Sequence, residues 1–207
     1  MPALSRIPCP GRRPVRPSAG WLAVLATAVL CLGLQALPED WRLALRYEPG
    51  AVLSGQWWRL WTAQLVHLGW VHAVLNLAGL ALIWGLVGRA MDALTALAVA
   101  ACSLGGVGLG LLFLAPQVAW YVGLSGALHG LLAGGACALI RHRDPLGVWL
   151  LALTAAKLVL EARWGPLGLR PEWIGGQVID VAHRYGAVSG AVPAALLPLP
   201  CRRSRRS

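Results

Sequence analysis

The 207-residue chain is 57% hydrophobic and 13% charged, with a mean hydropathy of +0.64. Soluble domains carry about 25% charged residues, so this composition excludes an ordinary soluble protein and favours a bundle of membrane helices. The net charge of +10 does not imply a nucleic-acid partner, because the arginines cluster at the ends of apolar segments, as the orientation of membrane helices requires.

Six apolar segments follow one another along the chain and predict an all-α membrane protein with six transmembrane helices. About 20 apolar residues are enough for a helix to cross the hydrocarbon core. The segments cover residues 20–37, 64–87, 91–115, 119–140, 145–161 and 177–199. We expect one transmembrane domain at residues 20–199, between a basic N-terminal tail (1–19) and a basic C-terminal tail (200–207).

The distribution of arginine predicts that both tails lie in the cytosol. Arginine is dense in the two tails, at Arg89 and at 141–143, whereas on the other side it is diluted by acidic residues. The positive-inside rule and the even number of segments therefore agree. A cleaved signal peptide is the alternative for the first segment, but no small-x-small cleavage site ends it, and we favour a retained helix.

The first outer connection, residues 38–63, interleaves tryptophan with arginine. Its tryptophans are Trp41, Trp57, Trp58 and Trp61. Tryptophan and arginine together suit the headgroup level of a bilayer, so we expect this segment to lie in the membrane interface. An ordinary aromatic belt would account for the same residues.

The second segment contains two candidate oxyanion donors, His72 and Asn76. Because they are four residues apart, they share one face of a helix. Each donor of this kind contributes about 3 kcal/mol of transition-state stabilisation. His67 points elsewhere, and we expect it to have a structural hydrogen bond.

The fourth segment contains the candidate nucleophile, Ser125, between Gly123 and Gly126. A glycine before the serine lets the chain turn into a helix. A helix that begins near Ser125 points free backbone N–H groups at a developing oxyanion. The lipase elbow is Gly-x-Ser-x-Gly, whereas this motif is Gly-x-Ser-Gly, so the lipase fold is not implied.

The sixth segment contains the candidate general base, His183, which shares one helix face with Gly186 and Gly190. The fourth segment has a matching stripe of Gly126, Gly130 and Gly134. Helices lined with glycine can approach closely, which would bring Ser125 and His183 together at a similar depth. We therefore expect a serine–histidine dyad that needs neither a metal nor a cofactor.

Three charged residues lie near the same end of the last two segments. Lys157 and Glu161 are four residues apart, which predicts an ion pair, with a substrate contact as the alternative. Asp180 could orient His183, although capping of the sixth helix is favoured. We expect no buried acidic third member of the dyad.

Together these motifs resemble those of the rhomboid family of intramembrane serine proteases. The matching motifs are His67-x-x-x-x-His72-x-x-x-Asn76, Gly123-x-Ser125-Gly126-x-x-x-Gly130, Ala182-His183-x-x-Gly186-x-x-x-Gly190 and the pair Trp58-Arg59. The resemblance covers about residues 38–195 and implies a six-helix bundle open to the outer face. It also implies Ser125 as nucleophile and His183 as general base. The oxyanion would be bound by His72, Asn76 and the Ser125 backbone N–H.

The short chain, the Trp-rich loop and the string Gly-Leu-Ser-Gly-x-Leu-His-Gly look more like one rhomboid subgroup, the rhombosortases. This likeness implies removal of C-terminal Gly-Gly (GlyGly-CTERM) sorting tails at the periplasmic face of the bacterial inner membrane. The acyl-enzyme would pass to water or to another nucleophile. The implied partners are membrane-anchored proteins with C-terminal transmembrane tails, together with the lipid bilayer.

One position departs from the family pattern. Many rhomboids have a tyrosine one helical turn after the serine, where its ring supports the catalytic histidine. Here that position is His129, which could stack on His183 or compete with it as a base.

Three other functions were weighed against a serine protease. A non-catalytic rhomboid-like factor that binds or handles membrane proteins would usually lack the serine or the histidine, and both are present. A transporter would show an inverted repeat, which is not evident. A metalloprotease using His67, His72 and His183 would lack a His-Glu-x-x-His motif and a carboxylate ligand.

Overall fold

The computed structural model describes residues 17–167 and 171–198, which are helical apart from loops and one isolated bridge between Tyr47 and Tyr121. The longer helices are α1 (Pro17–Gln35), α5 (Trp70–Val87), α6 (Ala93–Leu114), α7 (Ser125–Arg141), α8 (Pro145–Trp164) and α10 (Val181–Leu196). A 3-10 turn, η1 (Gly88–Ala90), follows α5. Most of the predicted N-terminal tail and the predicted C-terminal tail from residue 200 lie outside the described residues.

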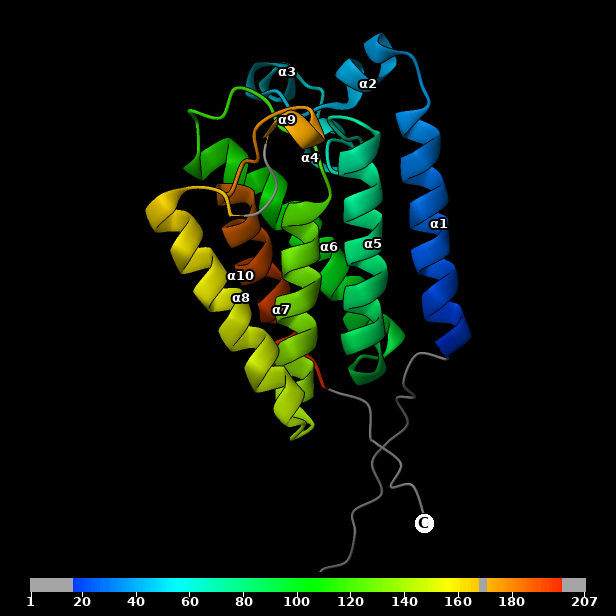
Figure 1. Cartoon of the computed structure of the whole chain (residues 1–207), viewed down its shortest axis with the longest axis vertical. Coiled ribbons are helices and arrows are strands. Elements are labelled where there is room, and N and C mark those ends of the chain that lie inside the picture. Colours follow the sequence, from blue (N-terminus) through cyan, green and yellow to red (C-terminus); the bar gives the residue numbers. More distant parts are fainter. Residues whose placement is uncertain (1–16, 168–170, 199–207) are drawn as a thin grey trace, which may run out of the picture.

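Four short helices gather at one end of the bundle (Figure 1). They are α2 (Glu39–Leu45), α3 (Pro49–Leu53), α4 (Arg59–Thr62) and α9 (Pro171–Ile174). This end of the molecule, called the loop end below, also holds the first residues of α5, α7 and α10 and the last residues of α8 (Figure 1). The functional motifs of three different helices are thereby brought to one end.

Three helices are long and apolar enough to cross a membrane, at Trp70–Ala90, Ala93–Leu114 and Pro145–Trp164. A shorter apolar helix covers Ala19–Gln35. In α7 and α10, of 17 and 16 residues, many positions are glycine or alanine. The predicted all-helical membrane class is confirmed, while the count of six spans and their orientation stay predictions.

Three helices begin later than the apolar segments that contain them, although the start of α7 at Ser125 agrees with the helix expected there. The second, fourth and sixth apolar segments were expected from residues 64, 119 and 177, whereas α5 begins at Trp70, α7 at Ser125 and α10 at Val181. Before α5 and α7 the preceding residues are loops whose apolar side chains are also buried, among them Val66, Val118 and Tyr121, whereas Val178 and Ile179 before α10 are half-buried. Burial of a loop and burial of a helix give the same hydropathy signal, and this similarity explains the error.

Glycines hold α7 against α10. A Cβ atom added to Gly130 would lie 2.5 Å from the Gly186 carbonyl oxygen, and one added to Gly134 would lie 2.5 Å from the Gly190 carbonyl oxygen. Because only hydrogen fits at these positions, the two helix backbones pack in direct contact, as the glycine stripes predict. The same face of α7 packs on Ser103 and Val99 of α6.

A buried arginine ties together the short helices within the loop of residues 38–63. Arg59 is 8% exposed, and its guanidinium donates hydrogen bonds to the Leu43 and Arg46 carbonyls and to Gln56 Oε1, at 2.7–2.9 Å. In contrast, the loop tryptophans named above are 46–66% exposed. Exposed aromatic rings on an ordered loop suit the membrane interface, and that location stays a prediction.

Candidate active site

Ser125 is the first residue of α7, and a glycine turn sets its position. Gly123 has φ +118°, a backbone conformation that residues other than glycine rarely adopt. Its N–H donates to the Ala63 carbonyl (3.0 Å), and its carbonyl accepts from the Tyr121 hydroxyl (2.6 Å). Tyr121 is in turn bridged to Tyr47 of the loop by two backbone hydrogen bonds. The turn before the serine is therefore fixed by hydrogen bonds to Ala63 and Tyr121, and Tyr121 is itself held by Tyr47.

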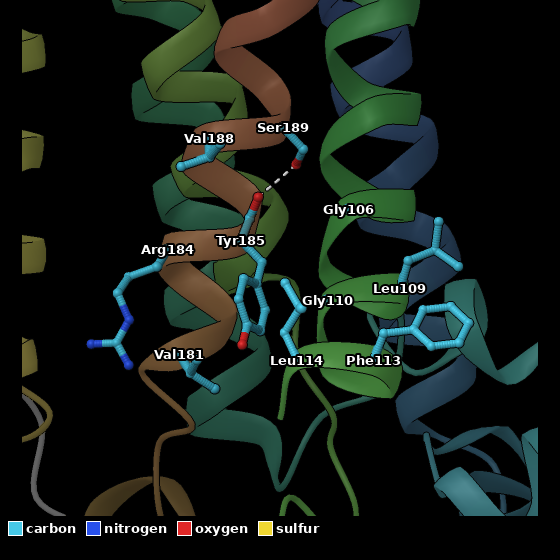
Figure 2. A pocket seen from close by; sticks show the side chains of 10 residues that line it. All are labelled: Gly106, Leu109, Gly110, Phe113, Leu114, Val181, Arg184, Tyr185, Val188 and Ser189. Carbon is cyan, nitrogen blue, oxygen red and sulfur yellow. Dashed lines mark hydrogen bonds between the residues drawn. The ribbon is translucent and has the colours of Figure 1, made fainter. Parts of the chain in front are cut away.

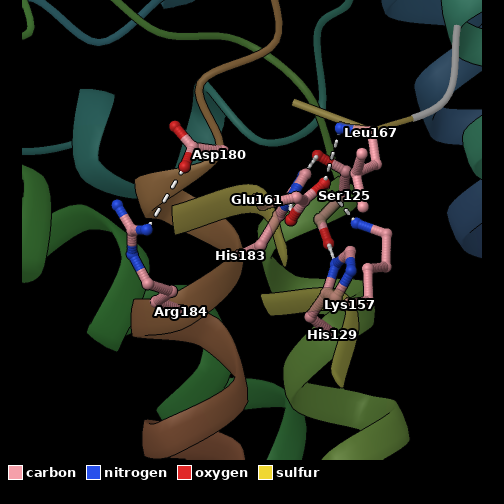
Figure 3. Close-up of polar contacts among 8 residues, drawn as sticks. All are labelled: Ser125, His129, Lys157, Glu161, Leu167, Asp180, His183 and Arg184. Carbon is pink, nitrogen blue, oxygen red and sulfur yellow. Dashed lines mark hydrogen bonds and ion pairs between the residues drawn. The ribbon is translucent and has the colours of Figure 1, made fainter. Parts of the chain in front are cut away.

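His183 lies in the first turn of α10, 4% exposed, with its ring directed at Ser125 (Figure 3). The distance between His183 Nε2 and Ser125 Oγ is 3.0 Å, which is a hydrogen bond. The glycine contacts between α7 and α10 make this approach possible, because larger side chains would hold the two helices apart. A serine hydroxyl on an imidazole nitrogen is the arrangement that activates a serine nucleophile.

His129 stacks on His183 and is not bonded to the serine hydroxyl. The two rings have centroids 4.1 Å apart and an interplanar angle of 19°. His129 Nδ1 lies 2.7 Å from the Ser125 carbonyl oxygen, so Nδ1 carries the proton and donates it. Of the two roles left open for His129, the geometry favours support of the His183 ring.

A buried carboxylate, that of Glu161, also contacts His183. Glu161, near the end of α8, is 2% exposed, and its Oε2 lies 3.0 Å from His183 Nδ1. Its Oε1 accepts from Lys157 Nζ at 2.5 Å, so the predicted ion pair is confirmed. The expectation that no buried acidic residue joins the dyad was wrong, because α8 turns Glu161 inward beside α10. An isolated carboxylate in an apolar segment was the signal that could have indicated it.

His72 faces the glycine turn from α5. A Cβ atom on Gly123 would lie 2.7 Å from His72 Cε1, so the imidazole packs directly against this turn. The Leu68 N–H donates to His72 Nδ1 at 3.4 Å, which leaves Nε2 as the protonated donor nitrogen of a neutral ring. Asn76 is 6% exposed and donates one amide N–H to the His72 carbonyl at 3.1 Å. Within the described residues, no hydrogen bond joins Asn76 to Ser125.

The family of the chain follows from a comparison with known domains. Residues 54–199 match the model of the Rhomboid domain family, and this range contains every candidate site residue. The chain belongs to the rhomboid family. No curated protein shows a significant match to it.

Rhomboids are intramembrane serine proteases, so the chain belongs to a family of membrane-embedded hydrolases that act on membrane proteins. The rhomboid match agrees with the serine–histidine contact between α7 and α10. It does not separate one rhomboid subgroup from another, nor does it assign individual catalytic residues.

Two smaller expectations about this rhomboid site were wrong. His67 has no hydrogen bond to either ring nitrogen within the described residues, and instead packs edge-on against His72 with centroids 5.1 Å apart. Burial lowers the pKa of His67 to about 3, so the ring is neutral there. Asp180 precedes α10 without a side-chain capping bond, and its carboxylate pairs with Arg184 at 3.3 Å. Asp180 is thus committed to Arg184, while Glu161 takes the place beside His183.

His129, Glu161 and His183 also offer one possible metal-ligand atom each, within 4.8 Å of one another. These atoms face protein partners: His183 contacts Ser125 and Glu161, and Glu161 contacts Lys157. A lysine ammonium on the carboxylate competes with a cation, so we assign the cluster to hydrogen bonding. His67, His72 and His183 do not form a candidate metal cluster in the part of the chain described.

A groove between α6 and α10 lies outside this site (Figure 2). Its walls include Gly110 of α6 and Tyr185, Val188 and Ser189 of α10. The groove is almost wholly apolar, although Arg184, the ion-pair partner of Asp180, also lines it. Ser125, His129, Glu161 and His183 do not line this groove. One face of α10 therefore carries His183 toward α7 and α8, while another lines an apolar surface.

Replacement of His129 by alanine should lower, but not abolish, reaction of Ser125 with a fluorophosphonate. A stacked aromatic pair contributes about 1 kcal/mol, so we expect a loss of roughly fivefold in labelling rate. His129→Phe keeps a ring on His183 and should lose less. Labelling that disappears in His129→Ala but persists in His183→Ala would make His129 the base.

Proposed function

We propose that this rhomboid is an intramembrane serine endopeptidase in which Ser125 is the nucleophile and His183 the general base. The observation that carries the proposal is the 3.0 Å hydrogen bond between Ser125 Oγ and His183 Nε2, made where both helices begin. The proposal is independent of any metal or cofactor, because serine and histidine together supply the nucleophile and the proton transfer.

The reaction would proceed through an acyl-enzyme. Ser125 Oγ attacks the carbonyl carbon of the scissile peptide, and its proton passes to His183 Nε2. When the C–N bond breaks, His183 returns that proton to the leaving amine. Water, or another nucleophile, then attacks the ester and releases the acyl product.

The oxyanion would lie next to the Gly123 turn. The Ser125 backbone N–H is at the free N-terminal end of α7, where donors and the positive end of the helix dipole favour negative charge. His72 Nε2 is a second donor against the same turn, and the remaining amide N–H of Asn76 is a third. Gly123 supports this geometry from the turn before α7, Gly126 from α7 itself, and Gly186 and Gly190 from α10.

We further propose that the substrates are membrane-anchored proteins with a C-terminal Gly-Gly sorting tail, as in rhombosortases. The support is the string from Gly123 to Gly130 and the Trp-rich loop with its exposed rings. Helices hide their carbonyls in hydrogen bonds, so glycine near the cleavage site favours the unwound state that attack requires. The rhombosortase likeness implies a bacterial inner-membrane location, and the arginine pattern supports cytosolic tails with the active site on the opposite, periplasmic side.

The test is cleavage of a reporter that carries a Gly-Gly motif, an apolar helix and a basic end, in proteoliposomes that contain the purified protein. We expect cleavage near the Gly-Gly motif, mapped by mass spectrometry, which persists in EDTA and is lost in Ser125→Ala. A matched reporter with the glycines replaced by leucine should be cleaved slowly.

The other outcomes separate the parts of this proposal. If the reporter is not cleaved but Ser125 reacts with a fluorophosphonate, the Gly-Gly substrate is wrong and the protein is a rhomboid protease of another specificity. An unreactive Ser125 in folded protein would favour the non-catalytic, membrane-protein-handling alternative. Loss of cleavage in EDTA would contradict the metal-independent mechanism.

A further inference from the structure

Glu161 lies on the opposite side of the His183 ring from Ser125 (Figure 3). We propose that Glu161 is a positioning residue that converts the Ser125–His183 pair into a Ser-His-Glu relay, with Lys157 holding its carboxylate in place. This inference rests on the proposed function, because it assigns a partner to the proposed base.

The hydrogen bonds around His183 define which nitrogen carries the proton. Glu161 Oε2 faces Nδ1 at 3.0 Å, and an ionised carboxylate only accepts, so Nδ1 is the donor. Nε2 is then the acceptor, 3.0 Å from the Ser125 hydroxyl. This is the tautomer that a general base requires. Without a partner on Nδ1, the ring could equally adopt the tautomer that cannot accept the serine proton.

The position of Glu161 follows from how α8 packs. Only three residues of α8 are buried, Gly147, Thr154 and Glu161, and they are seven residues apart. A spacing of seven places them on one face of the helix. Gly147 lets α8 touch the α7 backbone, since an added Cβ would lie 2.6 Å from the Ala136 carbonyl oxygen. At the loop end, the same face presents a carboxylate to His183 in place of an apolar side chain.

Burial of a carboxylate costs free energy unless its oxygens have partners, and both oxygens of Glu161 have partners among the described residues. Oε1 accepts from Lys157 Nζ and from the Leu167 N–H at 3.4 Å, while Oε2 accepts from His183. Two other titratable groups lie at this site: His129, which stacks on the His183 ring, and His72 of α5, which interacts electrostatically with His183. The arrangement keeps Glu161 ionised during the reaction, so the proton moves between Ser125, His183 and the leaving amine only.

Glu161→Gln is the main test, with fluorophosphonate labelling rates measured across pH in detergent. Loss of the corresponding carboxylate charge in serine proteases costs about 10⁴-fold in rate, and we expect a loss of at least 100-fold near pH 7. A carboxylate favours the protonated imidazole, so its removal should also move the acid limb of the pH profile to lower pH. Glu161→Asp should recover part of the rate.

Two further variants separate positioning from structure. Lys157→Met removes the positive charge beside Glu161 but keeps the carboxylate on His183. The protonated imidazole is then favoured, so the acid limb of the pH profile should move to higher pH, opposite to the shift in Glu161→Gln. Thr154→Ala alters the same buried stripe, but Thr154 bonds only the Leu150 carbonyl of its own helix. Its labelling profile should match the wild type, even if the protein unfolds at a lower temperature.

A labelling rate in Glu161→Gln within twofold of wild type, or an unshifted acid limb, would overturn the relay.

NMR of ¹⁵N-histidine-labelled protein gives a readout that needs no activity. We expect His183 protonated on Nδ1 in the wild type, and a mixture of tautomers in Glu161→Gln. A wild type that never labels would refute the proposed function, while the NMR comparison would still decide the role of Glu161.

Discussion

Ser125→Ala and His183→Ala should each abolish covalent labelling of the protein by a fluorophosphonate. In Ser125→Ala the attacking oxygen is absent, and in His183→Ala no base contacts the hydroxyl, since His129 donates its Nδ1 proton to the Ser125 carbonyl. Serine is a weak nucleophile without its base, and loss of either member costs roughly 10⁴-fold or more in rate. The measurement is the rate of labelling in purified, detergent-solubilised protein.

Ser189→Ala is the matched control for this result. Ser189 is a second serine with a short hydrogen bond, 2.6 Å from the Tyr185 carbonyl, but it lies on the α6 side of α10 in the apolar groove. It should label like the wild type. Labelling that persists in Ser125→Ala would mean that another residue is the nucleophile, and the assignment of this site would be wrong.

Gly186→Ala should destabilise the protein and inactivate it. An added Cβ would collide with the Gly126 carbonyl oxygen, which is backbone and cannot move away without shifting α7. Overpacking of this kind costs about 1–3 kcal/mol, which corresponds to a fall of roughly 2–12 °C in the unfolding midpoint for a protein of this size. The shift also lengthens the Ser125–His183 distance, so labelling should be lost even in the fraction that stays folded.

Gly105→Ala is the control, because an added Cβ at this position of α6 meets nothing within 4 Å. Alanine favours a helix over glycine by up to about 1 kcal/mol, so the midpoint should stay the same or rise. Thermal unfolding of both variants in the same detergent gives the comparison. Equal midpoints for Gly186→Ala and the wild type would show that α7 and α10 pack less tightly than described.

The glycine stripes and the serine motif were readable in the sequence because they depend on local periodicity. Gly126, Gly130 and Gly134 recur every four residues, and the helix does begin at Ser125. The apolar segments that contain α5 and α10 were read from residues 64 and 177, before either helix begins, because apolar loop residues such as Val66 and Ile179 precede them. Hydropathy reports burial, whereas the start of a helix is decided by backbone hydrogen bonds.

One contact of Glu161 was predicted from the sequence, and another was not. Its ion pair with Lys157 is a contact within one helix turn and was predicted from spacing alone. Its contact with His183 joins α8 to α10 and depends on the rotation of α8 about its own axis. That rotation is set by the buried stripe of Gly147 and Thr154, a long-range packing result that a single sequence does not encode in any local pattern.

The sequence by itself determined that this is a helical membrane protein of the rhomboid family, with a serine and a histidine on glycine-lined helices. Composition, period and spacing are properties of neighbouring residues, and they suffice for the helical membrane class and the glycine-lined helices. The family follows from the resemblance of the motifs and from the match of residues 54–199 to the rhomboid model. Only the tertiary structure decided that His129 stacks on the His183 ring and that Glu161 faces its second nitrogen. These contacts depend on ångström-scale packing of three helices, because a hydrogen bond exists only when its two atoms come within about 3 Å.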